Sequence, residues 1–181
     1  MSRTVVVTGA AGFIGAALTQ RLLQQGDRVV GLDNLNSYYD PSLKQARLDQ
    51  IQSMAPEQSW RFEPMALEEG EALMALFAEE SPQVVVNLAA QAGVRYSLEN
   101  PAAYIQSNLV GFGHILEGCR HHGVENLVYA SSSSVYGDAK DLPKRESHEG
   151  VPLSPYAVSK AVDEMYAHVF HDGYGQELIG L

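Results

Sequence analysis

Cysteine and basic residues are scarce in this sequence of 181 residues, which has one cysteine and 12 Lys and Arg against 22 Asp and Glu, a formal net charge of −10. A single thiol excludes an internal disulfide framework and leaves no cysteine cluster for zinc, so no metal site is expected. The acidic balance, with no run of Lys or Arg, argues against nucleic acid or an anionic membrane as a partner. A phosphorylated ligand is still compatible with this charge, because local backbone amides can bind phosphate.

Long apolar runs are also missing. No stretch approaches the roughly 20 residues that a membrane-spanning helix requires, and the first residues, MSRTVVV, lead directly into a strand-like segment. The content of 45% hydrophobic and 19% charged residues is enough to bury a sizeable core. We therefore expect one folded domain over residues 1–181, in the cytoplasm.

Short β-branched runs alternate with segments of helical periodicity. Each run is short and almost continuously apolar, which is typical of a parallel strand buried on both faces. Weaker strand candidates lie at 61–65 and 177–181. The four clear candidates are Thr4–Thr8, Arg28–Leu32, Val84–Leu88 and Leu127–Ser131.

Helices are predicted between these strands. Apolar stripes with helical spacing lie at 14–22 and 73–77. Two longer helices are predicted at about 101–121 and 155–171, because each begins with an Asn-Pro or Ser-Pro pair suited to the N-cap and first helical positions. The polar segment 138–152 is expected to be a surface loop. The alternation predicts an α/β fold, a Rossmann-like doubly wound parallel sheet with helices on both faces.

A glycine-rich turn follows the first strand. Gly9, Gly12 and Gly15 have the spacing G-x-x-G-x-x-G and open the first predicted helix, where backbone amides and the helix dipole can bind a pyrophosphate. Asp33 ends the second strand, where a carboxylate can accept hydrogen bonds from an adenosine ribose and repel a 2′-phosphate. An ordinary strand-end turn aspartate is the alternative. The combination favours a dinucleotide site for NAD over NADP.

Tyr156 and Lys160 lie four residues apart near the start of a predicted helix and share one face. A free tyrosine has a pKa of about 10, so it needs a nearby positive charge to act as a general base near neutrality. Lys160 and the helix N-terminus are expected to supply that charge. A surface Tyr/Lys pair without a role is the alternative. The serine run at 131–134 follows a strand and can place a hydroxyl at the same edge of the sheet.

Several segments together resemble the extended short-chain dehydrogenase/reductase family. The similarity spans essentially the whole chain, and within the NAD-dependent epimerases and dehydratases of that family it points to the UDP-glucuronate 4-epimerases. The segments are TGAAGFIG (Thr8–Gly15), LDNLNSYYDPSLKQARL (Leu32–Leu48), NLAAQAGVRYSLENP (Asn87–Pro101), SNLVGF (Ser107–Phe112), YASSSSVYG (Tyr129–Gly137) and SPYAVSK (Ser154–Lys160).

The resemblance implies roles for the residues that match the family's motifs. The pyrophosphate turn would comprise Gly9, Gly12, Phe13, Ile14 and Gly15. Further contacts to NAD would come from Asp33, Asn34, Leu67, Leu88, Ala89, Ala90, Tyr156 and Lys160. The catalytic set would be Ser132, Tyr156 and Lys160, and Ser132 and Ser133 would contact the substrate. Arg95 is a further candidate for a substrate contact, and a loop arginine without a ligand role is the alternative.

The implied reaction is NAD-dependent 4-epimerisation of a UDP-sugar, UDP-glucuronate to UDP-galacturonate, through a transient 4-keto intermediate. Ser133 and Ser134 stand where related dehydratases and decarboxylases carry acidic residues, which favours epimerisation, although a carboxyl group can come from elsewhere in the fold. UDP-galactose 4-epimerase and UDP-glucuronate decarboxylase remain alternatives. So does a module that binds NAD without catalysis.

Two departures from the family pattern bear on these expectations. Ala66 stands where many relatives have an aspartate that contacts adenine. Family members also continue beyond the point corresponding to Leu181 into a lobe that binds the UDP-sugar, so the chain is expected to be the NAD-binding portion, with little turnover alone. The resemblance further implies a homodimer through the helices at 101–121 and 155–171. Cys119 is expected to be a packing residue, and His121, His122, His168 and His171 are expected to lie on solvated faces rather than in a metal site.

Overall fold

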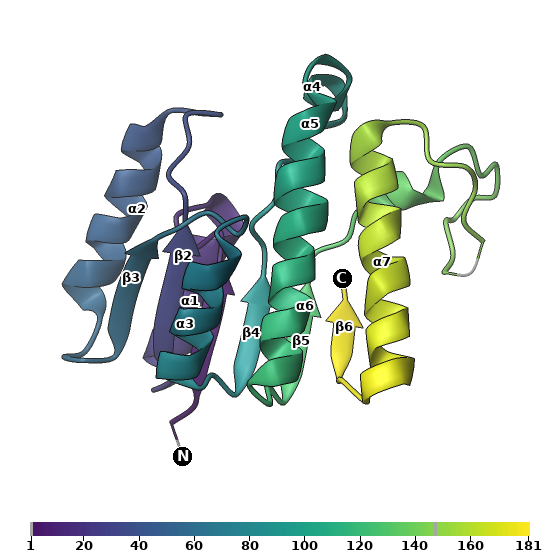
Figure 1. Cartoon of the computed structure of the whole chain (residues 1–181). Helices are drawn as coiled ribbons and strands as arrows, with labels where there is room; N and C mark the ends of the chain where they lie inside the picture. Colours follow the sequence, from purple (N-terminus) through teal and green to yellow (C-terminus); the bar gives the residue numbers. More distant parts are fainter. Residues whose placement is uncertain (1, 147) are drawn as a thin grey trace.

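The computed structural model describes residues 2–146 and 148–181 (Figure 1). The strands are β1 (Thr4–Thr8), β2 (Arg28–Asp33), β3 (Trp60–Pro64), β4 (Val84–Asn87), β5 (Asn126–Tyr129) and β6 (Leu178–Gly180). The helices are α1 (Phe13–Gln24), α2 (Pro41–Met54), α3 (Gly70–Glu80), α4 (Val94–Glu99), α5 (Pro101–Tyr104), the π-helix η1 (Ile105–Val110), α6 (Gly111–His121), the 3-10 helix η2 (Ser133–Tyr136) and α7 (Pro155–Tyr174).

The six strands form one parallel sheet in the order β3-β2-β1-β4-β5-β6. Successive side chains of a strand point to opposite faces, so Val6 of β1 belongs to one hydrophobic core and Val5 and Val7 belong to the other. The first core contains residues of α3, α6 and α7, and the second contains residues of α1 and α2. This arrangement confirms the predicted Rossmann-like fold with helices on both faces.

The helical segment predicted over 101–121 is divided into α5, η1 and α6. The π-helical part contains Asn108, which is buried and bonds to groups outside its own helix. Helices α2 and α4 were not predicted. Helix α2 lacks a clear apolar stripe because its buried face includes Lys44 beside Leu48 and Ile51, and α4 has only six residues.

Further expectations can be compared with the structure. Cys119 is buried in the core on the α6 side of the sheet, and this burial raises the pKa of its thiol. The described residues of 138–152 form no helix or strand, although Ser147 lies outside them. The exposed side chains of His121 and His168 pair with Glu117 and Asp172 on their own helices. No helix in the described part of the chain is long and apolar enough to cross a membrane.

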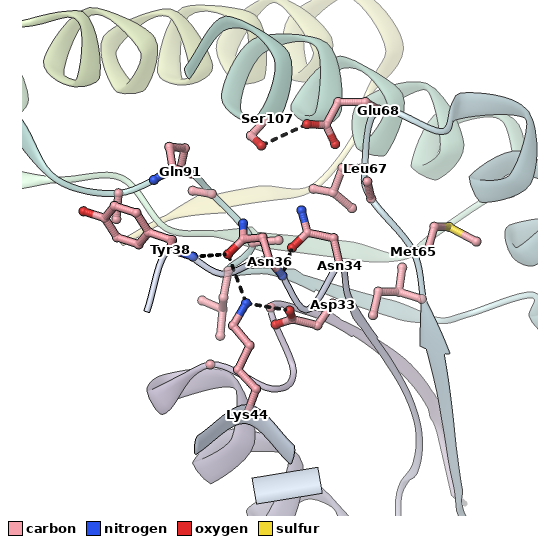
Figure 2. Close-up of a pocket in the computed structure, with 18 of the residues that line it drawn as sticks. Asp33, Asn34, Asn36, Tyr38, Lys44, Met65, Leu67, Glu68, Gln91 and Ser107 are labelled. Carbon is pink, nitrogen blue, oxygen red and sulfur yellow. Dashed lines mark hydrogen bonds and ion pairs between the residues drawn. The ribbon is translucent and has the colours of Figure 1, made fainter. Parts of the chain in front are cut away.

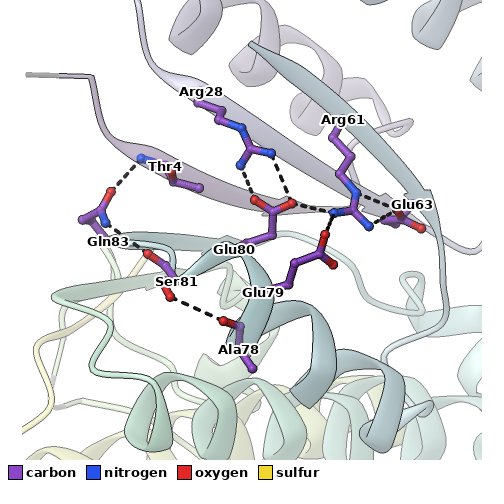
Figure 3. Close-up of polar contacts among 9 residues, drawn as sticks. All are labelled: Thr4, Arg28, Arg61, Glu63, Ala78, Glu79, Glu80, Ser81 and Gln83. Atoms are coloured by element: carbon purple, nitrogen blue, oxygen red, sulfur yellow. Dashed lines mark hydrogen bonds and ion pairs between the residues drawn. The ribbon is translucent and has the colours of Figure 1, made fainter. Parts of the chain in front are cut away.

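An ion-pair network joins the end of α3 to the beginnings of β2 and β3 (Figure 3). Glu80 is at its centre, with a side chain only 5% exposed, and it accepts hydrogen bonds from Arg28 and from Arg61 Nη1 at 2.7 Å. Glu79 makes a 2.6 Å contact with Arg61 but is 62% exposed. The arginine hydrogen bonds, that of Arg28 first, lower the pKa of Glu80.

Glu80→Gln is expected to lower the free energy of unfolding by about 1–2 kcal/mol, because two guanidinium groups lose a buried anionic acceptor. The matched control Glu79→Gln should change it by less than about 0.5 kcal/mol, since solvent screens the exposed pair. Urea unfolding at pH 7 measures both. The difference between Glu80→Gln and wild type should shrink as the pH falls below about 4.5, where the Glu80 carboxylate of the unfolded chain becomes protonated. Equal effects of the two variants would contradict the central role of Glu80.

Candidate functional site

The glycine turn (Gly9–Gly15) connects β1 to α1, and its backbone is packed too closely for side chains. Gly9 has a φ of +68°, and a Cβ there would lie 2.9 Å from the backbone nitrogen of Ala89. A Cβ on Gly12 would lie 2.9 Å from the carbonyl oxygen of Gly9, and one on Gly15 would lie 2.1 Å from the same oxygen. The N–H of Gly12 donates to that carbonyl at 2.9 Å. Each glycine is therefore required by the geometry of the turn.

The carboxyl ends of β1 and β4 are tied together by one hydroxyl group. Thr8 Oγ1 donates to Asn87 Oδ1 at 2.6 Å and accepts the N–H groups of Leu88 at 3.1 Å and Ala89 at 3.0 Å. These two strands are neighbours at the point where the strand order reverses. In open parallel sheets the crevice at this point is the usual ligand site.

Helix α1 begins directly after the glycine turn, and its N-terminus has no side-chain cap. Gly12 is its N-cap, and no side chain caps the helix and no acidic residue lies in its first turn. The free amides and the positive end of the helix dipole therefore suit an anion such as a pyrophosphate. Phe13 and Ile14 follow, and both side chains are exposed.

A pocket opens at this reversal of strand order, and we name it the switch-point pocket (Figure 2). Eight of the predicted cofactor residues line it: Gly9, Gly12, Asp33, Asn34, Leu67, Leu88, Ala89 and Ala90. The predicted Phe13, Ile14 and Gly15 are not among its lining residues. Lining residues that the sequence reasoning missed include Asn36, Tyr38, Tyr39, Lys44, Glu68, Gln91 and Ser107.

Asp33, the predicted ribose ligand, is already paired in the structure. Lys44 Nζ lies 3.1 Å from Asp33 Oδ1 and 3.3 Å from Asn36 Oδ1 (Figure 2). The side chains of Lys44 and Asp33 are 5% and 8% exposed. The only sequence signal for this contact is a lysine on the otherwise apolar buried face of α2.

A carboxylate lies near the position where Ala66 replaces the aspartate of relatives. Ala66 and Leu67 line the switch-point pocket, and so does the next residue, Glu68, whose Oε1 accepts a hydrogen bond from Ser107 Oγ at 3.0 Å (Figure 2). The pocket therefore retains an acidic group in this region, supplied by Glu68.

Tyr156 and Lys160 lie in the first turns of α7, whose N-cap Ser154 accepts the N–H of Ala157 at 3.1 Å. The ammonium group of Lys160 differs from the expectation: it pairs with Asp163 Oδ2 at 3.0 Å, and both side chains are buried. The positive charge of Lys160, which was expected to stabilise the phenolate of Tyr156, is therefore paired with the carboxylate of Asp163. Burial raises the pKa of Asp163 to about 6, although Lys160 acts in the opposite direction.

A buried hydrogen-bond chain joins the switch-point pocket to α7. Asn108 accepts the backbone N–H of Gln91 at 2.8 Å and donates to the carbonyl of Gln91 at 3.1 Å and to Ser159 Oγ at 2.9 Å. Ser159 Oγ donates to the carbonyl of Tyr156 at 2.8 Å. The segment that carries Gln91 and the helix that carries Tyr156 are therefore fixed relative to each other.

The predicted catalytic serine lies in a second depression, which we name the serine hollow. Ser132 caps η2 by accepting the N–H of Ser134 at 3.2 Å, and Ser131 Oγ donates to Glu164. The hollow is lined by Tyr129, Ser131, Ser132, Ser133, Val135, Tyr136, Glu146, Glu149, Glu164, Gly180 and Leu181. Three carboxylates therefore lie around the serines. The lack of an acidic residue at positions 133 and 134 no longer distinguishes epimerisation from decarboxylation.

Other predicted residues lie apart from these two cavities. Tyr156 and Lys160 line neither of them, although α7 packs against η2. Arg95 is exposed on α4 and lines neither. In the described part of the chain, no three His, Cys, Asp or Glu side chains come together in a group that could hold a metal ion.

The parallel sheet, the glycine turn and the carboxylate at the end of β2 are together the features of a fold of the Rossmann type. Residues 6–180 match the family model described as GDP-mannose 4,6 dehydratase. The chain belongs to this family of NAD-dependent epimerases and dehydratases, the extended short-chain dehydrogenases/reductases, as its motifs predicted.

Relatives with assigned names include nucleotide-sugar epimerases. The chain is 47% identical to Protein CapI of Staphylococcus aureus over 98% of this chain and 52% of that protein, and 45% identical to UDP-glucuronate 4-epimerase 4 of Arabidopsis thaliana over 98% and 40%. The crystal structure of UDP-glucuronic acid 4-epimerase from Bacillus cereus, in complex with UDP-glucuronic acid and NAD, is similar with a TM-score of 0.88 and 31% identity, over 98% of this chain and 55% of that one. The chain thus spans about half the length of these relatives.

Proposed function

We propose that residues 1–181 bind NAD and form the cofactor-binding part of a UDP-sugar 4-epimerase, with UDP-glucuronate as the substrate. The observation that carries the proposal is the glycine turn, where a Cβ on Gly9, Gly12 or Gly15 would collide with neighbouring backbone atoms, so that only glycine permits this close turn before α1. The first-turn amides of α1 would hold the pyrophosphate of NAD, and Asp33 would hold the adenosine ribose. The named relatives support the choice of UDP-glucuronate.

Three side chains, those of Tyr156, Ser132 and Lys160, would act in the proposed reaction. Tyr156 would remove the proton from the C4 hydroxyl of the sugar and return it after the 4-keto intermediate has turned over. Ser132 would donate a hydrogen bond to the same oxygen, and Lys160 would lie beside the nicotinamide end of the cofactor. NAD, when bound, supplies the acceptor and donor of the C4 hydride.

Titration of the purified chain with NAD and, separately, with UDP-glucuronate tests this proposal by calorimetry. We expect NAD to bind and to raise the unfolding temperature. Turnover of UDP-glucuronate is proposed for a protein in which these residues are joined to the remaining half found in the relatives, and we expect little from residues 1–181 alone. A chain that does not bind NAD would overturn the proposed cofactor role. Release of CO₂ from UDP-glucuronate by such a longer protein would indicate decarboxylation instead.

We further propose a homodimer through α5–α6 and α7. Large hydrophobic side chains remain exposed along these helices and α4, and a second copy would cover them. They are Leu98, Ile105, Val110, Val158, Met165, Tyr166 and Val169. Analytical ultracentrifugation of wild type and of Met165→Glu tests this assignment, because the charge should dissociate a dimer formed at this surface.

A further inference from the structure

Helix α2 places a buried cation directly behind the carboxylate of the switch-point pocket. Lys44 is one of the buried residues of α2, although a charged group is costly to bury unless it is paired. Its ammonium group donates to Asp33 Oδ1 at 3.1 Å and to Asn36 Oδ1 at 3.3 Å (Figure 2). It also lies 5.1 Å from the ring centroid of Tyr39.

This contact determines which oxygen of Asp33 is available to a ligand. Oδ1 accepts two donors, Lys44 Nζ and the backbone N–H of Leu35 at 2.9 Å. Within the part of the chain that the structure describes, no hydrogen bond reaches Oδ2. Because both donors hold Oδ1, rotation of the carboxylate would break two bonds in a buried environment. Oδ2 is therefore held ready to accept a hydroxyl group.

The same helix is also hydrogen-bonded to the glycine turn, which fixes the position of the backbone that carries Lys44. Arg47 Nη1 donates to the carbonyl of Ala11 at 3.2 Å and to Tyr39 Oη at 3.1 Å. The ring of Tyr39 is near both cations, with Arg47 Cζ 5.8 Å from its centroid. Helix α2 thus contacts both parts of the proposed cofactor site, the carboxylate of Asp33 and the pyrophosphate turn.

We propose that Lys44 is a positioning residue for dinucleotide binding, which acts by orienting Asp33 so that its free oxygen accepts the 2′-hydroxyl of the adenosine ribose. This inference rests on the proposed NAD-binding function. It differs from a purely structural role for the ion pair, because a structural ion pair would support every ligand of the pocket equally. The two roles can therefore be distinguished by removing the 2′-hydroxyl group from the ligand.

The test compares NAD with NAD that lacks the 2′-hydroxyl of its adenosine ribose. Calorimetry on wild type should show about tenfold weaker binding of the deoxy compound, since a hydrogen bond to a charged group is lost. Lys44→Met should weaken NAD binding about tenfold but leave the deoxy compound nearly unaffected, so the ratio of the two dissociation constants approaches one. Lys140→Met, which removes the same charge from an exposed loop residue, should leave both constants and their ratio unchanged.

Thermal unfolding of each variant shows whether it is folded, and Lys44→Gln provides the same comparison if Lys44→Met does not fold. Equal losses of affinity for both ligands, or a ratio that stays near ten, would overturn the role of Lys44 while leaving the NAD-binding function in place. If wild type binds neither compound, the proposed function fails, and the inference fails with it.

Discussion

Replacing Gly15 with alanine is expected to weaken NAD binding by about 100-fold or more, because the glycine turn must move by about an ångström to admit the methyl group. The new Cβ would lie 2.1 Å from the carbonyl oxygen of Gly9, 2.7 Å from its carbonyl carbon and 3.1 Å from the Cα of Ala10. All three atoms belong to the backbone, so no side-chain rotation relieves the contact. We also expect the free energy of unfolding to fall by about 3 kcal/mol.

The matched control is Gly113→Ala in α6, where a Cβ would meet no atom within 4 Å. Alanine there should stabilise the protein by about 0.5–1 kcal/mol, because it restricts the unfolded chain and fits a helix. NAD titration and urea unfolding of both variants measure these effects. Unchanged NAD affinity in Gly15→Ala would show that the turn is not the pyrophosphate site.

Lys160→Met is expected to reduce the free energy of unfolding by about 3–5 kcal/mol at pH 7.5, because it leaves the carboxylate of Asp163 buried without its cation. Asp163 Oδ1 already has no hydrogen-bond partner among the described residues, so Lys160 is the main compensation for that charge. The double variant Lys160→Met with Asp163→Asn should recover most of the loss. Urea unfolding of the two variants provides the comparison. A single variant within about 1 kcal/mol of wild type would contradict the importance of the pair.

The same pair predicts a dependence on pH with a definite sign. Burial raises the pKa of Asp163 from 3.8 to about 6, so the folded state favours its protonated form. The contribution of this group to stability is therefore present at low pH and is lost as the pH rises from about 4 through about 6. Without Lys160, which lowers this pKa, the loss extends to higher pH. Lys160→Met should thus regain stability relative to wild type between pH 7.5 and 5.5, by up to about 1.4 kcal/mol per pH unit, and the double variant should not.

The sheet could be predicted from the sequence because its central strands are buried on both faces. Runs such as Thr4–Thr8 have a continuous apolar centre, Val5–Val7, and the predicted ends of the six strands differ from the observed ones by at most two residues. Helix α2 could not be predicted in the same way, since its buried face carries Lys44. The π-helical turn at Asn108 depends on partners in distant segments, which no local pattern reveals.

The residues of the candidate site also differ in whether a local sequence pattern reveals them. The glycine turn and Asp33 are local signals, and the structure places Gly9, Gly12 and Asp33 in one pocket. Lys44 and Glu68 were missed because their position depends on how α2 and the segment after β3 pack at the edge of the sheet. The pairing of Lys160 with Asp163 was also missed. Lys160 lies four residues after Tyr156 and three before Asp163, and the sequence analysis considered only the first of these two helical spacings.

The order of the strands also has a consequence for how the protein folds. Thr8 Oγ1 bonds to residues that follow it by 79 to 81 positions, and Gly9 packs closely against the backbone of Leu88 and Ala89. The complete glycine motif and Asp33 are therefore present in the growing chain well before their binding geometry can exist. Contacts of such long sequence separation form slowly, because the intervening loop must first be closed. We expect affinity for NAD to appear late in refolding, together with the docking of β4 beside β1.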